Sequence, residues 1–164
     1  MRSNLLRRMA LVTMFAVGVL CAQKAPATLP AFSLPDLDGK SVNSADWKGK
    51  VVVVDFWATW CVACREAFPI LSGLKDKYGD RLVIAGISTD QNGGAAKVGK
   101  FAKKSNLNYL VLLDPSDTQS KVFGYSSIPA LYVFGPDGKL LANYSGLEEE
   151  NQKKLEALIA QQWK

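Results

Sequence analysis

The stretch "VVVVDFWATWCVACREAFP", residues 51–69, joins a run of apolar, β-branched residues to two cysteines three positions apart. The run is apolar at odd and even positions alike, as in a strand that is covered on both faces of a sheet. From Val62 to Tyr78 apolar residues recur at helical spacing, and Pro69 is expected to kink this helix. The stretch therefore predicts a buried central strand that runs into a helix, with the two cysteines at the junction.

Strands and helices alternate through the rest of the chain. A hairpin is expected around Asp38-Gly39, a pair that favours a tight turn, and another over residues 130–146, with its turn at 135–138. This order predicts an α/β fold with a central mixed β-sheet and helices on both faces. The remaining expected elements are strands at 81–89 and 110–114, helices at 93–106 and 115–125, the latter with Pro115 near its first position, and a closing helix over 148–164.

The N-terminal residues have the composition of a secretory signal peptide. Three arginines precede an uncharged apolar stretch from Met9 to Ala22, which is short for a membrane span of about 20 residues. We therefore expect residues 1–22 to be a cleaved signal peptide, with an uncleaved N-terminal membrane anchor as the alternative. A linker rich in Pro and Ala over 23–29 then leads into one domain, residues 30–164.

The predicted signal peptide accounts for much of the basic charge. Residues 1–22 hold three of the 20 basic residues and none of the 15 acidic ones, so without them the formal net charge falls from +5 to +2. No block of Lys and Arg interleaved with aromatic residues remains, and nucleic acid is therefore not an expected partner. Export also places the cysteines in a compartment where disulfides form and persist.

The cysteines at positions 61 and 64 permit several kinds of site. Structural zinc needs four ligands, mostly Cys or His, whereas the chain has no His and its third cysteine, Cys21, lies in the predicted signal peptide. A copper-transfer site lacks imidazole for the same reason, and we expect no metal. A purely structural disulfide is an alternative, although closing so short a loop removes little entropy from the unfolded chain.

Thiol–disulfide exchange suits the position of the two cysteines better. Backbone N–H groups without partners and the positive end of the helix dipole lie where the helix begins, and both favour a thiolate. Cys61 is therefore the predicted nucleophile. Cys64 lies one turn further along the same helical face, where it is placed to attack a mixed disulfide formed at Cys61. The expected redox centre is the Cys61–Cys64 disulfide, with no other cofactor.

Residues 52–69, "VVVDFWATWCVACREAFP", resemble the active-site stretch of the thioredoxin superfamily, with an aspartate six residues before the first cysteine and a proline eight residues after it. The chain from about Pro30 to Lys164 is similar to the TlpA/ResA-like branch of exported thiol-disulfide oxidoreductases, which has an N-terminal hairpin and an inserted helical region like residues 91–106. The resemblance implies a thioredoxin-like fold with an N-terminal β-hairpin extension. It also implies a periplasmic or extracytoplasmic, membrane-associated location in a bacterium.

The resemblance assigns two acidic residues to the site. By resemblance to thioredoxin, Asp55 is a buried carboxylate with a raised pKa that accepts the Cys64 proton; the alternative is an aspartate where the strand reaches the surface. Glu66 is implied as a similar group in ResA-like proteins. Its alternative is an acid that simply favours the first turn of a helix.

The same resemblance implies substrate-binding residues. Ile128-Pro129 resembles a cis-proline loop opposite the CxxC pair, which leaves the Ile128 backbone free to pair with an extended substrate segment; an ordinary trans proline is the alternative. From its place in the strand, Trp57 is expected in the core. Trp60, next to Cys61, is expected either to shield the disulfide or to line the substrate surface.

These features predict a protein-disulfide reductase that acts on exported proteins, with cytochrome c maturation as one task of the family. Val62 and Ala63 contribute no charge or imidazole to the Cys61 thiolate, which favours a reducing pair nearer to thioredoxin than to the oxidant DsbA. The expected partners are protein disulfides and a membrane thiol-disulfide electron donor. Two alternatives remain: a thiol peroxidase of the AhpC/TSA type, and a non-catalytic binding module that uses the groove beside Pro129.

Overall fold

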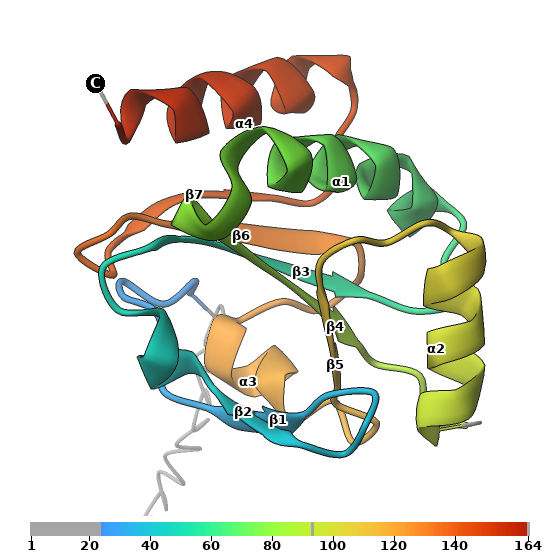
Figure 1. Ribbon diagram of the computed structural model, residues 1–164. Coiled ribbons are helices and arrows are strands. Elements are labelled where there is room, and N and C mark those ends of the chain that lie inside the picture. The colour runs from blue at the N-terminus through green and yellow to red at the C-terminus, as the bar shows by residue number, and fades with distance from the viewer. Residues whose placement is uncertain (1–23, 93, 164) are drawn as a thin grey trace, which may run out of the picture.

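A five-stranded mixed sheet forms the centre of the computed structural model, which describes residues 24–92 and 94–163 (Figure 1). Its strands lie in the order β5-β4-β3-β6-β7. β3, β4 and β5 run parallel, whereas β6 and β7 are antiparallel to their neighbours, so the predicted mixed sheet is confirmed. The strands are β3 (Val51–Trp57), β4 (Leu82–Ser88), β5 (Leu110–Leu113), β6 (Ala130–Phe134) and β7 (Leu140–Tyr144).

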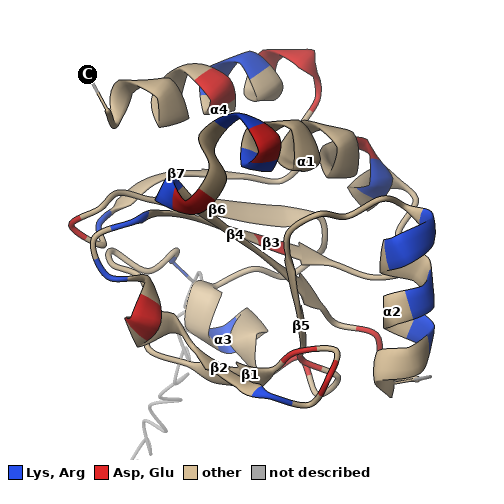
Figure 2. Cartoon of the chain, viewed as in Figure 1, with Lys and Arg blue, Asp and Glu red and all other residues tan. Residues whose placement is uncertain are grey.

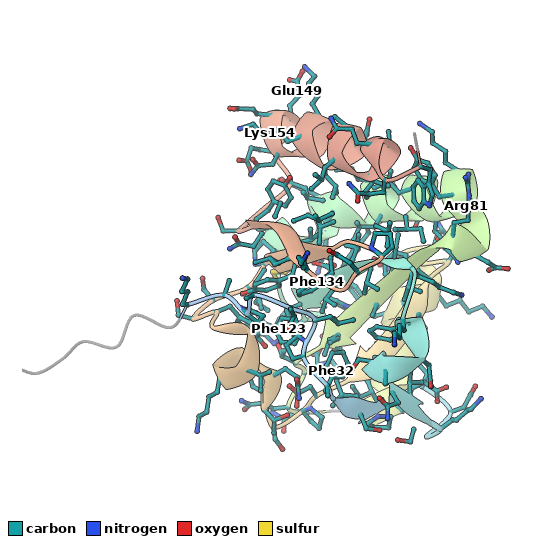
Figure 3. The ribbon with its side chains drawn as sticks, turned by 90° about the vertical axis from the view of Figure 1, so that its left-hand side faces the viewer. Phe32, Arg81, Phe123, Phe134, Glu149 and Lys154 are labelled. Carbon is teal, nitrogen blue, oxygen red and sulfur yellow. A yellow bond between two sulfur atoms is a disulfide. The ribbon has the colours of Figure 1, made fainter. Side chains whose placement is uncertain are left out.

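Strand β3 lies at the centre of the sheet, and all seven of its residues are buried, as predicted. Because side chains alternate along a strand, its even-numbered residues point to one face and its odd-numbered residues to the other. We call these the Phe56 face and the Asp55 face. The Phe56 face is rich in aromatic rings: the centroid of Phe123 lies 6.0 Å from that of Phe32 and 6.3 Å from that of Phe134 (Figure 3).

Helices cover both faces of the sheet, as predicted (Figure 1). Helices α1 (Ala67–Tyr78) and α4 (Glu149–Gln161) lie over the Asp55 face, where their apolar side chains pack on those of Val51 and Val53. Helix α3 (Gln119–Phe123) and a separate sheet of β1 (Ser33–Pro35) and β2 (Ser41–Asn43) lie over the Phe56 face. Helix α2 (Gly94–Lys104) packs beside Trp57. Figure 2 shows that the charged residues lie mainly on the helices and connecting segments.

Both predicted hairpins are confirmed. Strands β1 (Ser33–Pro35) and β2 (Ser41–Asn43) pair antiparallel, and the backbone N–H groups of residues 38 and 40 donate to Asp36 Oδ1 in the turn between them. Gly39 in that turn has a φ of +82°, which favours glycine. Strands β6 and β7 form the second hairpin, with residues 135–138 in its turn.

The helix predicted from Val62 is divided in two. A 3-10 helix, η2 (Ala63–Glu66), comes first, and the α-helix α1 begins only at Ala67. Pro69 is the third residue of α1, where a backbone N–H has no partner within the helix. Pro69 therefore lies in the first turn of α1 and not in the helix interior, and it removes no hydrogen bond within α1.

The helix predicted over 115–125 is shorter than expected. Helix α3 spans only Gln119–Phe123, so the expectation that Pro115 lies near its first position is wrong. The Asp114 carboxylate, at the end of β5, accepts the backbone N–H groups of Thr118 at 3.0 Å and Gln119 at 2.9 Å. These bonds satisfy donors at the start of the helix, which therefore begins after the turn that Pro115 occupies.

The chain enters the described part of the molecule along the β6–β7 hairpin. Leu29 donates its N–H to the Gly138 carbonyl at 2.8 Å, and Leu140 donates to the Ala27 carbonyl at 2.9 Å. The predicted signal peptide lies outside the described residues. Within residues 24–92 and 94–163, no helix has the length and apolar character needed to cross a membrane.

Candidate active site

Cys61 and Cys64 form a disulfide where β3 gives way to η2. Their Cα atoms are 5.4 Å apart. Cys61 is 6% exposed, whereas Cys64 is completely buried. A substrate that approaches from solvent therefore meets Cys61 before Cys64, which is the arrangement needed for an outer nucleophile and an inner resolving thiol.

A backbone amide holds the Cys61 sulfur. The N–H of Cys64 donates to Cys61 Sγ at 3.2 Å, and the N–H of Cys61 donates to the carbonyl of Ala58 at 3.1 Å. A donor directed at a sulfur favours its ionised form, because the thiolate is the better acceptor. The structure thus supplies thiolate stabilisation through one specific amide in the turn, since η2 begins at Ala63 and not at Cys61.

Asp55 is buried in the centre of the sheet, on the face that α1 covers. Only 1% of it is exposed, and neither carboxylate oxygen has a hydrogen-bond partner among the described residues. Desolvation by burial raises the pKa of Asp55 to about 7. The alternative of a strand aspartate at the surface is therefore wrong.

Trp57 and Trp60 have opposite environments. Trp57 is completely buried and packs with both cysteines, which confirms its predicted place in the core. Trp60 is 65% exposed and, with Val62 at 73%, makes an apolar surface beside the disulfide. Of the two expectations for Trp60, the structure favours the residue that lines an open surface.

The Ile128–Pro129 peptide bond is cis, so the alternative of a trans proline is wrong. Ile128 packs against the cluster that contains the two cysteines. Ile128 and Trp60 line one cavity of about 450 Å³, together with polar residues from the loops that follow β4 and α3. The structure thus brings three of the predicted site regions together: the disulfide, Trp60 and the cis-proline loop.

Glu66 lies on the exposed side of η2, two residues after Cys64. Unlike Asp55, it is not drawn into the interior of the domain. Its neighbour Arg65 donates to the carbonyl of Thr59 at 3.2 Å, and the Arg65 guanidinium lies 5.4 Å from the ring centroid of Phe101. The two predicted acidic residues therefore occupy different environments, one buried and one in contact with solvent.

Asp90 is a site residue that the sequence analysis missed. Its buried carboxylate accepts the N–H of Thr59 at 2.7 Å and the Thr59 hydroxyl at 2.5 Å. Ser88 and Lys97 also donate to it, at 2.9 and 3.3 Å. Burial raises the pKa of Asp90, but these hydrogen bonds outweigh that effect and hold the pKa below its usual value. Asp90 thus fixes the turn that leads to Cys61.

The sequence carried a signal for this contact. Asp90 directly follows a buried strand, as Thr59 does, and the carboxyl ends of parallel strands meet at one edge of a sheet. Among the described residues, by contrast, no group of three or more His, Cys, Asp or Glu side chains is placed to hold a metal ion.

Comparisons with known proteins agree with this geometry. The family model described as Redoxin matches residues 24–159. The chain is 32% identical over 131 residues to the thiol-disulfide oxidoreductase ResA of Bacillus thuringiensis subsp. konkukian (strain 97-27), which covers 79% of this chain and 73% of that protein. It is 30% identical over 143 residues to the thioredoxin-like protein YneN of Bacillus subtilis (strain 168), with 85% and 81% covered.

Solved structures share the fold. A protein of Chlorobium tepidum, assigned as the thiol:disulfide interchange protein DsbE, is similar with a TM-score of 0.77 and 26% identity, over 85% of this chain and 97% of that one. A thiol-disulfide oxidoreductase from Bacteroides fragilis NCTC 9343 is similar with a TM-score of 0.68 and 28% identity, over 80% and 98%. These likenesses confirm the expected thioredoxin-like fold.

Proposed function

The chain belongs to the Redoxin family and is an enzyme, a thiol-disulfide oxidoreductase, and we propose that it works as a reductant of disulfides in other proteins. The observation that carries the proposal is the unequal exposure of the bonded cysteines, because it gives the two sulfurs different roles. An exposed apolar surface at Trp60 and Val62 beside Cys61 supports a protein as the substrate.

The reaction begins with the reduced pair. The Cys61 thiolate, held by the Cys64 N–H, attacks one sulfur of the substrate disulfide; a Cys61–substrate bond forms and the other substrate sulfur leaves as a thiolate. Extended substrate backbone beside the reacting sulfur would lie along the cavity between Trp60 and Ile128. The attack requires no movement of the buried Cys64.

The second step releases the product. Cys64 transfers its proton to the Asp55 carboxylate and attacks Cys61 Sγ as a thiolate; the Cys61–substrate bond breaks, and the second substrate sulfur leaves as a thiolate. Two electrons have then passed to the substrate, and the Cys61–Cys64 disulfide has formed. A carboxyl whose pKa is about 7 is matched to proton transfer at neutral pH, which supports Asp55 as the base. Glu66, on the solvent side of η2, is the second candidate base.

We also propose an extracytoplasmic location. The proposal rests on residues 1–22, which have the composition of an export signal. A reductant in an oxidising compartment must be reduced again after each turnover. The proposed source of electrons is therefore a thiol-disulfide donor in the membrane.

The test uses the purified chain and insulin. Cys61→Ser is expected to abolish insulin reduction, whereas Cys64→Ser is expected to accumulate a mixed disulfide with the substrate that dithiothreitol reverses, visible as a mass increase. A potential of about −270 mV against glutathione would support a reductant, whereas about −120 mV would contradict that direction. Peroxide consumption that survives Cys64→Ser would favour the thiol peroxidase. Partner binding untouched by Cys61→Ser, with insulin intact, would favour the binding module.

A further inference from the structure

Four unpartnered polar atoms gather on the Asp55 face of the sheet. Among the described residues, five buried side-chain nitrogen or oxygen atoms have no hydrogen-bond partner, and four of them are the two oxygens of Asp55, Nε1 of Trp57 and the hydroxyl of Tyr109. All three side chains are at least nine-tenths buried. Such groups are costly to bury without partners, so their concentration on one face calls for a functional explanation.

Gly86 shows how close these groups lie to one another. It is the register partner of Asp55 on the neighbouring strand β4. A Cβ atom at Gly86 would lie 2.9 Å from Trp57 Nε1 and 3.0 Å from Tyr109 Cε2, the ring atom bonded to the carbon that carries the hydroxyl. Neighbouring strands are about 4.8 Å apart. Both donors therefore approach Asp55 through the space that the absent side chain of Gly86 leaves.

The chemistry of the three groups is complementary. An ionised carboxylate only accepts hydrogen bonds, an indole N–H only donates, and a phenol donates readily. We propose that Tyr109 is a positioning residue for proton transfer: with Trp57 Nε1 it donates to the Asp55 carboxylate, directly or through one water molecule, whenever Asp55 is ionised. This inference rests on the proposed role of Asp55 as the base that accepts the Cys64 proton.

Tyr109 acts without losing its own proton. Burial, and then the negative charge of Asp55, raise the pKa of the Tyr109 hydroxyl well above its usual value. In the resolving step the proton moves from Cys64 to Asp55. Before this transfer Asp55 is ionised, and the tyrosine hydroxyl donates a hydrogen bond to the ionised carboxylate. The hydroxyl therefore favours the form of Asp55 that is able to accept a proton.

The helices that cover the Asp55 face place no charged side chain among their described buried residues. The buried side chains of α1, α2 and α4 within the described residues are apolar: Ala67, Phe68, Leu71, Leu74, Val98, Ala102, Leu155 and Ile159. Among the described residues, Tyr109, whose pKa the Asp55 charge raises, is therefore the titratable group on this face that acts on Asp55. A change in the ionisation of Asp55 after removal of the Tyr109 hydroxyl has a single origin.

The test is Tyr109→Phe, which keeps the ring and removes only the hydroxyl, with Tyr132→Phe on the Phe56 face as the matched control. The full chain carries a mixed disulfide at Cys61 with a model peptide, and the release rate is followed against pH. Tyr109→Phe is expected to slow release about tenfold at pH 6 and to leave it unchanged at pH 9, because the Asp55 pKa rises. Tyr132→Phe is expected to match the parent protein.

A direct readout separates this inference from the role of Asp55. The pKa of Asp55 is measured by carboxyl ¹³C NMR in the oxidised chain, where no reaction takes place. A higher Asp55 pKa in Tyr109→Phe than in the parent would support the contact between Tyr109 and Asp55. If Asp55→Asn left the release rate unchanged, that result would reject only the role of Asp55 as the base. An identical Asp55 pKa in Tyr109→Phe and the parent would overturn the inference.

Discussion

The two faces of strand β3 share one backbone and have opposite characters. On the Phe56 face the strand presents only apolar side chains, and the Phe56 ring lies 4.9 Å from that of Phe123 and 4.4 Å from that of Tyr125, between centroids. On the Asp55 face the same strand presents a carboxylate and an indole N–H without partners. The Phe56 face stabilises the domain, whereas the Asp55 face loses part of that stability because it buries polar groups without hydrogen-bond partners.

The largest expected effect comes from a substitution on the Phe56 face. Phe56→Ala removes a completely buried ring from the aromatic cluster and leaves a cavity. We expect a loss of about 3–5 kcal/mol in the free energy of unfolding, measured with urea at pH 7 on the oxidised protein. Val122→Ala, at a position 44% exposed on α3, is the control, with an expected change of about 0.5 kcal/mol or less. Equal losses at the two positions would remove the contrast between the faces.

The second change is expected to act in the opposite direction. The pKa of Asp55 rises from 3.8 in the unfolded chain to about 7 in the folded one. Between these values the folded state holds a proton that the unfolded state has lost, so stability declines as pH rises from about 4 to 7 and is level above that. Asp55→Asn lacks this decline and is expected to be more stable at pH 8, by at most about 4 kcal/mol.

Urea unfolding of the oxidised protein at pH 4 and pH 8 measures this difference. The advantage of Asp55→Asn is expected to be large at pH 8 and small at pH 4. Glu66→Gln is the control, because Glu66 is exposed and its replacement is expected to leave the pH dependence unchanged. A constant difference between parent and Asp55→Asn across this pH range would show that the carboxylate carries no such cost.

The smallest expected effect concerns Asp90, a buried carboxylate at the end of the sheet that, unlike Asp55, has hydrogen-bond partners. Asp90→Asn weakens the hydrogen bonds from Thr59 and Lys97, and we expect it to cost about 1–3 kcal/mol at pH 7. Because the folded pKa of Asp90 lies below 3.8, its contribution is present above the unfolded pKa and is lost as pH falls through the folded pKa. Thermal unfolding checks this against Asp38→Asn, an exposed control. An unchanged melting temperature in Asp90→Asn would argue against a stabilising role for these hydrogen bonds.

Local sequence signals predicted the elements that depend on local chemistry. The valine run predicted the central strand, because a strand buried on both faces has apolar residues at odd and even positions alike and valine is β-branched, which favours strands. Asp38-Gly39 predicted the first hairpin because the turn needs a positive φ. The spacing of the cysteines predicted that they could form a disulfide, because a separation of three positions brings the two side chains together.

Features that depend on the detailed geometry of a turn or on distant parts of the chain were not predictable in this way. Helical spacing does not reveal that α1 begins only at Ala67, nor that Asp114 sets the start of α3 through bonds to residues further on. Tyr109 and Gly86 meet only because β4 and β5 are neighbours in the sheet, which brings residues of separate segments to the same point. Such contacts follow from the packing of the whole domain.

Ala27 and Leu29 attach the N-terminal segment to the β6–β7 hairpin at the end of the sheet that lies away from the cysteines. Phe134, at the end of β6, pairs with Val52 at the start of β3, so this hairpin turn lies at the opposite end of the central strand from Trp57. Seven strand residues separate the two ends by roughly 20 Å. A surface, a resin bead or a fused protein joined at residue 24 would thus meet the domain at the end of the central strand opposite Cys61, which would leave this cysteine accessible to large partners.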